Sequence, residues 1–289
     1  MSRIVFNNVK KKLGSFELDI PHLEINEGYI TGFVGENGAG KTTSIKLILG
    51  MLIPDSGTIE IDGMDIRKHG VEIKKKIGYV GDPTGYPEES KLKNIKRMYA
   101  PFYSTWDEKL FEKYVSRFGL KLDSKYKDLS TGQKKQFAMV MALAHRPSLI
   151  LLDEPTSGLD PVVRQDILDV LMEHMQDEKV SVFYSTHITS DLERAGDYLV
   201  YIKNGKIKID STLDELLETY CIVSGPKELF TSEVQKELLG YRTSKFGVEA
   251  LVASRSLGED LFGREVQYSK PSIEEIMVFL ANKGGEKTW

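Results

Sequence analysis

The sequence contains the stretch Gly35-Glu36-Asn37-Gly38-Ala39-Gly40-Lys41-Thr42, which fits the spacing G-x-x-x-x-G-K-[ST] of a phosphate-binding loop. Glycines in such a loop let successive backbone N–H groups turn inward around phosphate oxygens, and the next helix points its positive N-terminal end at the same place. Lys41 is long enough to reach the β- and γ-phosphates of a nucleotide, and the hydroxyl of Thr42 suits Mg²⁺. The stretch therefore predicts binding of a nucleoside triphosphate together with Mg²⁺.

The residues on either side give this loop the context that it needs. Tyr29 to Val34 reads as a buried strand that runs into the loop. Lys41 to Leu52 follows with apolar residues at helical spacing. A glycine-rich structural turn is the alternative interpretation, and the strand–loop–helix order argues against it.

Outward from the loop, strands alternate with helices, which predicts an α/β core with much parallel sheet. The first sixty residues read mainly as strands, and residues 91 to 120 look helical. Asn204-Gly205 is a hairpin turn signal. Ser272, before Ile273-Glu274-Glu275, has the pattern of a helix cap with its box partner. The expected elements are strands at 3–9, 16–20, 59–61, 77–80, 149–152, 180–185, 198–203 and 206–210, and helices at 129–141 and 163–175.

Two carboxylates end the predicted strand at 149–152. Asp153 suits a Mg²⁺ role in a P-loop enzyme, and Glu154 is placed to polarise a water against the γ-phosphate. An ordinary pair of strand-end carboxylates is the alternative, and alone it would be equally good. The phosphate loop elsewhere in the chain favours the catalytic interpretation.

Three further segments carry polar groups at element ends. Leu129-Ser130-Thr131-Gly132-Gln133 heads a predicted helix and can offer N–H groups and a hydroxyl to phosphate, although the same letters also make a plain helix cap. Ser157-Gly158-Leu159-Asp160 follows the acidic pair, and His187 follows the strand at 180–185. A lone histidine after a strand is more often structural, but this one stands in a series.

Composition excludes several classes of protein. The 289 residues carry a formal net charge of -4 and only short basic runs, so we expect no nucleic-acid partner. No apolar stretch approaches the roughly 18 residues that a membrane helix needs, and the N-terminus predicts no signal peptide. The single cysteine, Cys221, excludes an internal disulfide and a multi-cysteine metal site and suits a reduced cytoplasm.

In this order the segments resemble the nucleotide-binding subunit of ABC transporters, over roughly residues 3 to 215. Gly35 to Thr43 resembles the Walker A motif, and Leu129 to Gln133 the signature motif. Leu149 to Glu154 resembles Walker B with its catalytic glutamate, Ser157 to Asp160 the D-loop, and His187 the switch histidine. The C-terminal segment resembles that of bacterial exporters for antibiotics, peptides or toxins, including the phenol-soluble-modulin exporter group.

The resemblance implies a P-loop NTPase core of the ABC ATPase type. An antiparallel β subdomain and a helical subdomain inserted at about 86–140 would belong to a domain at 1–215, and 216–289 would form a small α+β appendage. ATP and Mg²⁺ are the implied cofactors. A second ATPase subunit and a transmembrane permease are the implied partners, at the cytoplasmic face of the membrane.

Residue roles also follow from the resemblance. Lys41, Glu154 and His187 would act in catalysis. Thr42, Asp153 and Asp82 would hold Mg²⁺. ATP would lie between one subunit's phosphate loop, Gly35 to Thr43, and its partner's Ser130, Gly132, Gln133 and Asp160.

The sequence departs from the family pattern at three positions. Leu13 stands where an aromatic residue often stacks on adenine, with Phe16 close by. Thr131 replaces a glycine of the signature, and Asp82 replaces a glutamine. We expect Asp82 either to bind Mg²⁺ or to cap the turn that follows it.

Two other classes compete with a transporter subunit. One is a soluble ABC ATPase of translation, iron–sulfur assembly or DNA repair. Translation factors carry two motif sets, and repair ATPases carry long coiled coils, which this chain lacks between Lys41 and Ser130. The other is an unrelated P-loop kinase, which the signature and His187 argue against.

Overall fold

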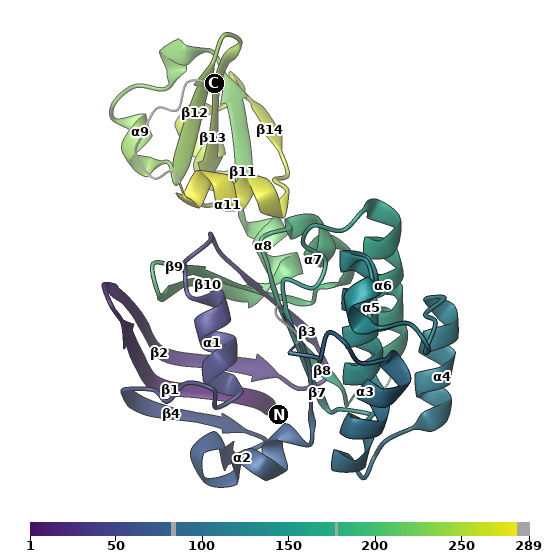
Figure 1. Cartoon of the computed structure of the whole chain (residues 1–289). Helices are drawn as coiled ribbons and strands as arrows, with labels where there is room; N and C mark the ends of the chain where they lie inside the picture. Colours follow the sequence, from purple (N-terminus) through teal and green to yellow (C-terminus); the bar gives the residue numbers. More distant parts are fainter. Residues whose placement is uncertain (82–84, 177–178, 282–289) are drawn as a thin grey trace. The chain divides into compact units, whose positions relative to one another are not determined.

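The computed structural model describes residues 1–81, 85–176 and 179–281. Their contacts divide the chain into two compact units, Met1–Asp210 and Ser211–Trp289 (Figure 1). The domain boundary that the sequence analysis places between residues 215 and 216 stays a prediction. Across the described residues we find no helix with both the length and the apolar content that crossing a bilayer requires.

An antiparallel sheet with the strand order β2-β1-β4-β5 opens the first unit. Alternate residues of its first strand, such as Ile4 and Phe6, are fully buried, as expected for a sheet with one face on a core. The pairing of β1 with β2 ends where Leu13 lies opposite Phe16. The strands are β1 (Ser2–Leu13), β2 (Phe16–Asn26), β4 (Ser56–Ile61) and β5 (Met64–Asp65).

A six-stranded sheet with the order β10-β9-β3-β8-β7-β6 forms the centre of the first unit. Every residue of β3, β7 and β8 is buried, which is typical of parallel strands covered on both faces. The register pairs Val34 with Thr186 and Asp153 with Ser185, so the chain leaves these three strands at one edge. The strands are β3 (Ile30–Val34), β6 (Ile77–Val80), β7 (Leu149–Asp153), β8 (Ser181–Thr186), β9 (Tyr198–Lys203) and β10 (Lys206–Thr212).

The helices of this unit include a group inserted between β6 and β7, where α4 packs on α5. Residues 91–120, which look helical in the sequence, form two helices because Pro101 has no N–H to donate and Asp107 caps a new helix. Figure 1 shows α3 to α6 gathered together. The helices are α1 (Lys41–Ile48), α2 (Ile66–Lys74), α3 (Leu92–Tyr99), α4 (Glu108–Arg117), α5 (Thr131–Leu143), α6 (Pro161–His174) and α7 (Thr189–Ala195).

The predicted hairpin turn at Asn204-Gly205 is anchored on both sides. The Gly205 N–H donates to the Ala39 carbonyl at 3.0 Å, and the Gly205 carbonyl accepts from the Asp19 N–H at 2.8 Å. Gly205 has φ +73°, and a Cβ there would collide with the Glu17 carbonyl. The turn therefore joins the phosphate loop to β2 through a single backbone residue.

The second unit has a four-stranded antiparallel sheet in the order β12-β13-β11-β14. After a first helix its elements run β-α-β-β-α-β, which with this strand order is a ferredoxin-like arrangement, and a further helix follows. Ser272 and Glu275 form the predicted capping box, because each backbone N–H donates to the other's side chain. The elements are α8 (Leu213–Thr219), β11 (Cys221–Gly225), α9 (Val234–Glu237), β12 (Gly240–Ser244), β13 (Gly247–Val252), α10 (Arg255–Phe262), β14 (Gln267–Ser269) and α11 (Ile273–Ala281).

Candidate functional site

The phosphate loop lies between β3 and α1, as the sequence predicts. Gly38 and Gly40 adopt φ of +81° and +118°, conformations that favour glycine. Gly40 is the N-cap of α1, so the free N–H groups of that helix lie at the end of the loop. The loop has the backbone and the helix terminus that suit an anionic ligand.

Lys41 is 6% exposed and turns back over the loop. Its ammonium donates to the Gly35 carbonyl at 2.7 Å and to the Glu36 carbonyl at 3.3 Å. Its Nζ also lies 3.4 Å from Oε1 of Glu154. The structure therefore brings the predicted cation and the predicted base together.

Asp153 is placed beside the first turn of α1. Its Oδ1 accepts from the hydroxyls of Thr42 and Ser185, both at 3.2 Å. The pKa of the Asp153 carboxyl is raised, because the effect of burial exceeds the opposing effect of the hydrogen bonds from Thr42 and Ser185. Strand pairing causes this arrangement, because Asp153 lies opposite Ser185 in the register of β7 and β8.

The oxygens of Thr42 and Asp153 fit a magnesium site. Mg²⁺ in nucleotide enzymes takes one or two protein oxygens and completes its shell with phosphate and water. Among the residues that the structure describes, no group of three or more His, Cys, Asp or Glu could form an all-protein cage. The third predicted ligand, Asp82, lies outside the described residues.

Glu154 has an unusual backbone, with φ +50° in a residue other than glycine. Its N–H donates to the Ser185 carbonyl at 3.0 Å. Its Oε2 lies 2.7 Å from Nδ1 of His187, and its Oε1 faces Lys41. One carboxylate thus stands between the lysine and the histidine, which are 146 positions apart in the sequence.

Ser130 and Gln133 cap α5 rather than face the loop. The Gln133 N–H donates to the Ser130 hydroxyl at 3.2 Å, and the Ser130 N–H donates to the Gln133 side chain at 3.1 Å. Ser130 is exposed, and a Cβ on Gly132 would lie 3.3 Å from Val163 of α6. The signature segment therefore lies beside the start of α6.

Asp160 is the N-cap of α6 and is exposed. Its Oδ1 accepts from the N–H groups of Val162 and Val163 at 3.0 and 3.1 Å. Within the described parts of the chain, no hydrogen bond or ion pair joins Asp160 or the signature residues to Gly35–Thr43.

Lys135 is a site residue that sequence reasoning missed. Its ammonium donates to the carbonyls of Glu154 at 2.8 Å and Ser157 at 2.6 Å, so α5 is tied to the loop that carries the predicted base. In the sequence, Lys135 is simply a lysine two positions after Gln133. No local pattern predicts that its ammonium donates to backbone carbonyls 19 and 22 residues away.

The predicted adenine side of the loop contains Leu13 and Phe16. Leu13 is 41% exposed at the end of β1. Phe16 is partly buried, and its Cζ would lie 3.1 Å from a Cβ on Gly40. The aromatic ring of Phe16 therefore packs beside the phosphate loop.

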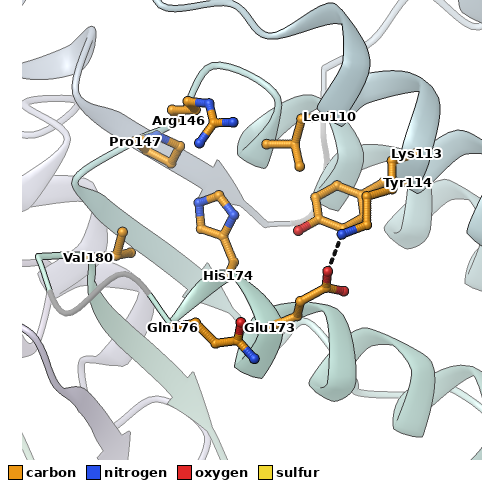
Figure 2. Close-up of a pocket in the computed structure, with 9 residues that line it drawn as sticks. All are labelled: Leu110, Lys113, Tyr114, Arg146, Pro147, Glu173, His174, Gln176 and Val180. Carbon is orange, nitrogen blue, oxygen red and sulfur yellow. Dashed lines mark hydrogen bonds and ion pairs between the residues drawn. The ribbon is translucent and has the colours of Figure 1, made fainter.

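Two cavities in the first unit differ in their relation to these residues. One, of about 190 Å³, is lined by Asp153, Thr131 and Lys135. The other, of about 260 Å³, has no predicted site residue in its lining, and Lys113 pairs there with Glu173 (Figure 2). The lining of the second cavity consists of Leu110, Lys113, Tyr114, Arg146, Pro147, Glu173, His174, Gln176 and Val180.

Comparison with known proteins gives consistent matches. A family model described as "ABC transporter" matches residues 18–157. The chain is 30% identical over 272 residues to the ABC transporter ATP-binding protein YtrB of Bacillus subtilis, covering 92% of this chain and 93% of that protein. It is 31% identical over 220 residues to the bacitracin transport ATP-binding protein BcrA of Bacillus licheniformis, covering 75% and 72%. A solved ATP-binding subunit of an ABC transporter has a TM-score of 0.66 at 28% identity, covering 74% of this chain and 92% of that one.

Proposed function

The chain belongs to the family of ABC transporter ATP-binding proteins, and on that premise we propose how its residues bind and hydrolyse ATP. As a member of this family it is an ATP-binding subunit and an ATPase. The observation that carries the assignment of roles is the contact of Glu154 with both Lys41 and His187 beside the phosphate loop.

We assign phosphate binding to Gly35–Thr43. Lys41 is held by loop carbonyls and by Glu154, so an incoming γ-phosphate offers its ammonium a stronger anionic partner. Thr42 and Asp153 would hold Mg²⁺, which neutralises charge on the phosphates when it is bound. Release of Lys41 from Glu154 leaves the carboxylate free to accept a proton from water.

Glu154 is the proposed base, and His187 the proposed contact to the γ-phosphate. The strained backbone of Glu154 and its bond to Ser185 fix where the carboxylate can point. His187 contacts the same carboxylate, so the proposed base and the proposed phosphate contact lie side by side. Catalysis then depends on position and charge rather than on a covalent intermediate.

The ATP site is proposed to form between two copies. Ser130, Gly132, Gln133 and Asp160 lie at the N-terminal ends of α5 and α6, two positions that favour anions. Among the residues that the structure describes, no hydrogen bond or ion pair joins them to Gly35–Thr43 of their own chain, which supports a role toward the phosphates of a second chain. ATP binding would then favour the paired state over separate subunits.

A groove in the first unit is the proposed seat of the permease. A cavity of about 240 Å³ is lined by Met51, Tyr79, Tyr99, Tyr103 and other residues from the core and the helical insert. Met51 is 60% exposed in a lining where apolar and aromatic side chains gather, and a patch of this kind suits an apolar partner surface. Family members act with a transmembrane subunit, and we place this chain at the cytoplasmic face of the membrane through that subunit.

Export of peptides, antibiotics or toxins is the proposed transport, and the likeness to a bacitracin transport protein supports this class of cargo. A soluble ABC ATPase that is not coupled to transport is the alternative. Co-purification of the full chain with a multi-span membrane protein supports the first, and its absence under gentle detergent extraction supports the second.

The substitution Glu154→Gln tests the proposed chemistry. It keeps the shape of the side chain and removes the base, so we expect ATP turnover to fall by at least about a hundredfold. ATP binding should persist, and the variant should elute as a dimer in ATP and Mg²⁺ on a sizing column. Glu112→Gln, an exposed change on α4, is the control. A normal rate in Glu154→Gln would remove Glu154 from this role.

A further inference from the structure

A buried carboxylate lies at the centre of a hydrogen-bond cluster that the proposed chemistry does not use. Asp191, in the first turn of α7, is 1% exposed. Its Oδ2 accepts from the Thr156 hydroxyl at 2.6 Å and from the Tyr184 hydroxyl at 2.8 Å. Its Oδ1 accepts from Nε of Arg164 at 2.5 Å. Groups from three other segments therefore converge on one carboxylate.

Both oxygens of Asp191 are satisfied, as a buried charge requires. Arg164, on α6, supplies the opposite charge and reaches the Ser190 hydroxyl at 2.7 Å. Thr156 and Tyr184 are also 1% exposed, and their hydroxyl oxygens lie 3.1 Å apart. Asp191, Thr156 and Tyr184 are buried, so solvent cannot replace a hydrogen bond that is lost between them, whereas the side chain of Arg164 is 27% exposed.

The cluster connects the two loops that carry Glu154 and His187. Thr156 follows Glu154 by two residues, and Asp191 follows His187 by four. The positive φ of Glu154 persists only if neighbouring residues hold it. Lys135 holds this loop through two backbone carbonyls, and Asp191 holds it through the Thr156 side chain.

Resting on the roles proposed above for Glu154 and His187, we propose that Asp191 is a positioning residue that sets the placement of the base and the histidine relative to each other. Within the described residues, no hydrogen bond or ion pair joins Asp191 directly to Glu154 or His187. Asp191 fixes Thr156 on one loop and the start of α7 on the other, so one carboxylate determines the geometry of both. Displacements of about 1 Å in such groups reduce turnover strongly.

Asp191→Asn tests this proposal in the full-length chain. The amide keeps the size of the side chain but weakens the bonds from Arg164 and Thr156. We expect kcat to fall by at least about tenfold, while the Kd for ATP, measured by calorimetry, changes by less than about twofold. Asp169→Asn is the matched control, because Asp169 also pairs α6 with α7, through Arg194 at 3.0 Å, but on the exposed surface. The control should keep the normal kcat.

Thr156 provides a second test if Asp191→Asn does not fold. Thr156→Val keeps the volume and removes the hydroxyl, whereas Thr156→Ser keeps the hydroxyl. We expect Thr156→Val to lower kcat by at least about fivefold and Thr156→Ser to retain it within about twofold. If the two residues act through one bond, Thr156→Val should lower kcat little further in an Asp191→Asn background.

Glu154→Gln in the same assay separates failure of this inference from failure of the proposed function. Normal kcat in folded Thr156→Val, with Glu154→Gln inactive, overturns the positioning role alone. Equal losses in Thr156→Ser and Thr156→Val also overturn it, because volume would then explain the effect. Full turnover in Glu154→Gln would instead remove the catalytic role on which this inference rests.

Discussion

At the residue scale, base recognition depends on Leu13 and Phe16. An exposed leucine offers adenine no aromatic face, and Phe16 is packed beside Gly40. A missing stack is worth on the order of 1 kcal/mol, so we expect ATP and GTP to bind with affinities that differ by less than about tenfold. Calorimetry with both nucleotides measures this ratio.

Two variants sharpen that measurement. Leu13→Tyr restores an aromatic ring and should raise the preference for ATP. Phe16→Ala should leave the ratio nearly unchanged. A strong ATP preference that Phe16→Ala abolishes would show instead that Phe16 stacks on the base.

At the scale of elements, Arg3 joins the antiparallel sheet to the parallel one. It is 5% exposed on β1 and donates to Asp62, to Glu27 at 2.9 Å, to the Ser181 hydroxyl at 3.2 Å and to the Lys179 carbonyl at 2.6 Å. Arg3→Met removes all of these donors. We expect it to lower the free energy of unfolding by about 2–4 kcal/mol, measured by urea denaturation.

Arg67→Met is the matched control for that change. Arg67 pairs with Asp65 at 3.0 Å, but its side chain is 44% exposed. An exposed pair adds little to the free energy of unfolding, so the control should unfold near the normal midpoint. A loss in Arg3→Met as small as the loss in Arg67→Met would show that Arg3 acts as an ordinary surface charge.

The sequence predicts some elements closely and misses others for physical reasons. β6 matches its predicted bounds, and β7 is longer by one residue, because short apolar runs between turns mark buried strands. α2 was missed because it contains Gly70 and is kinked at His69, with only Ile66 and Ile73 buried.

The candidate site was predictable only where its chemistry is local. The phosphate loop lies in one continuous stretch, so its residues and its context could be read from the sequence. The contacts of Asp153 with Ser185 and of Asp191 with Thr156 join positions 32 and 35 residues apart. They depend on strand order and on burial, which no periodicity encodes. The same holds for β11, which pairs with both β13 and β14.

At the scale of the whole molecule, each unit has a hydrophobic core of its own. The core of the first contains Ile4, Phe33 and Ile45, and that of the second contains Val223, Ala250 and Phe262. We expect a chain that ends at Asp210 to bind ATP with a Kd within about twofold of the full chain, because a compact unit of this size can fold alone. Calorimetry with circular dichroism as a folding check measures this.

The reciprocal fragment, residues 211–289, is the control and should fold without binding ATP. A folded 1–210 chain that fails to bind ATP would contradict the assignment of the nucleotide site to the first unit.

The anchored turn at Gly205 has a consequence for protein engineering. Hairpin turns are common places to insert a fluorescent reporter, because exposed loop tips accept extra residues. At Asn204-Gly205 an insertion would break the bond to Ala39 and disturb the very loop whose ligand the reporter is meant to detect. The turn between β12 and β13 offers a better place, since Phe246 there is 99% exposed. A reporter inserted at Gly205 would distort the phosphate loop, whereas one inserted at Phe246 would leave that loop intact.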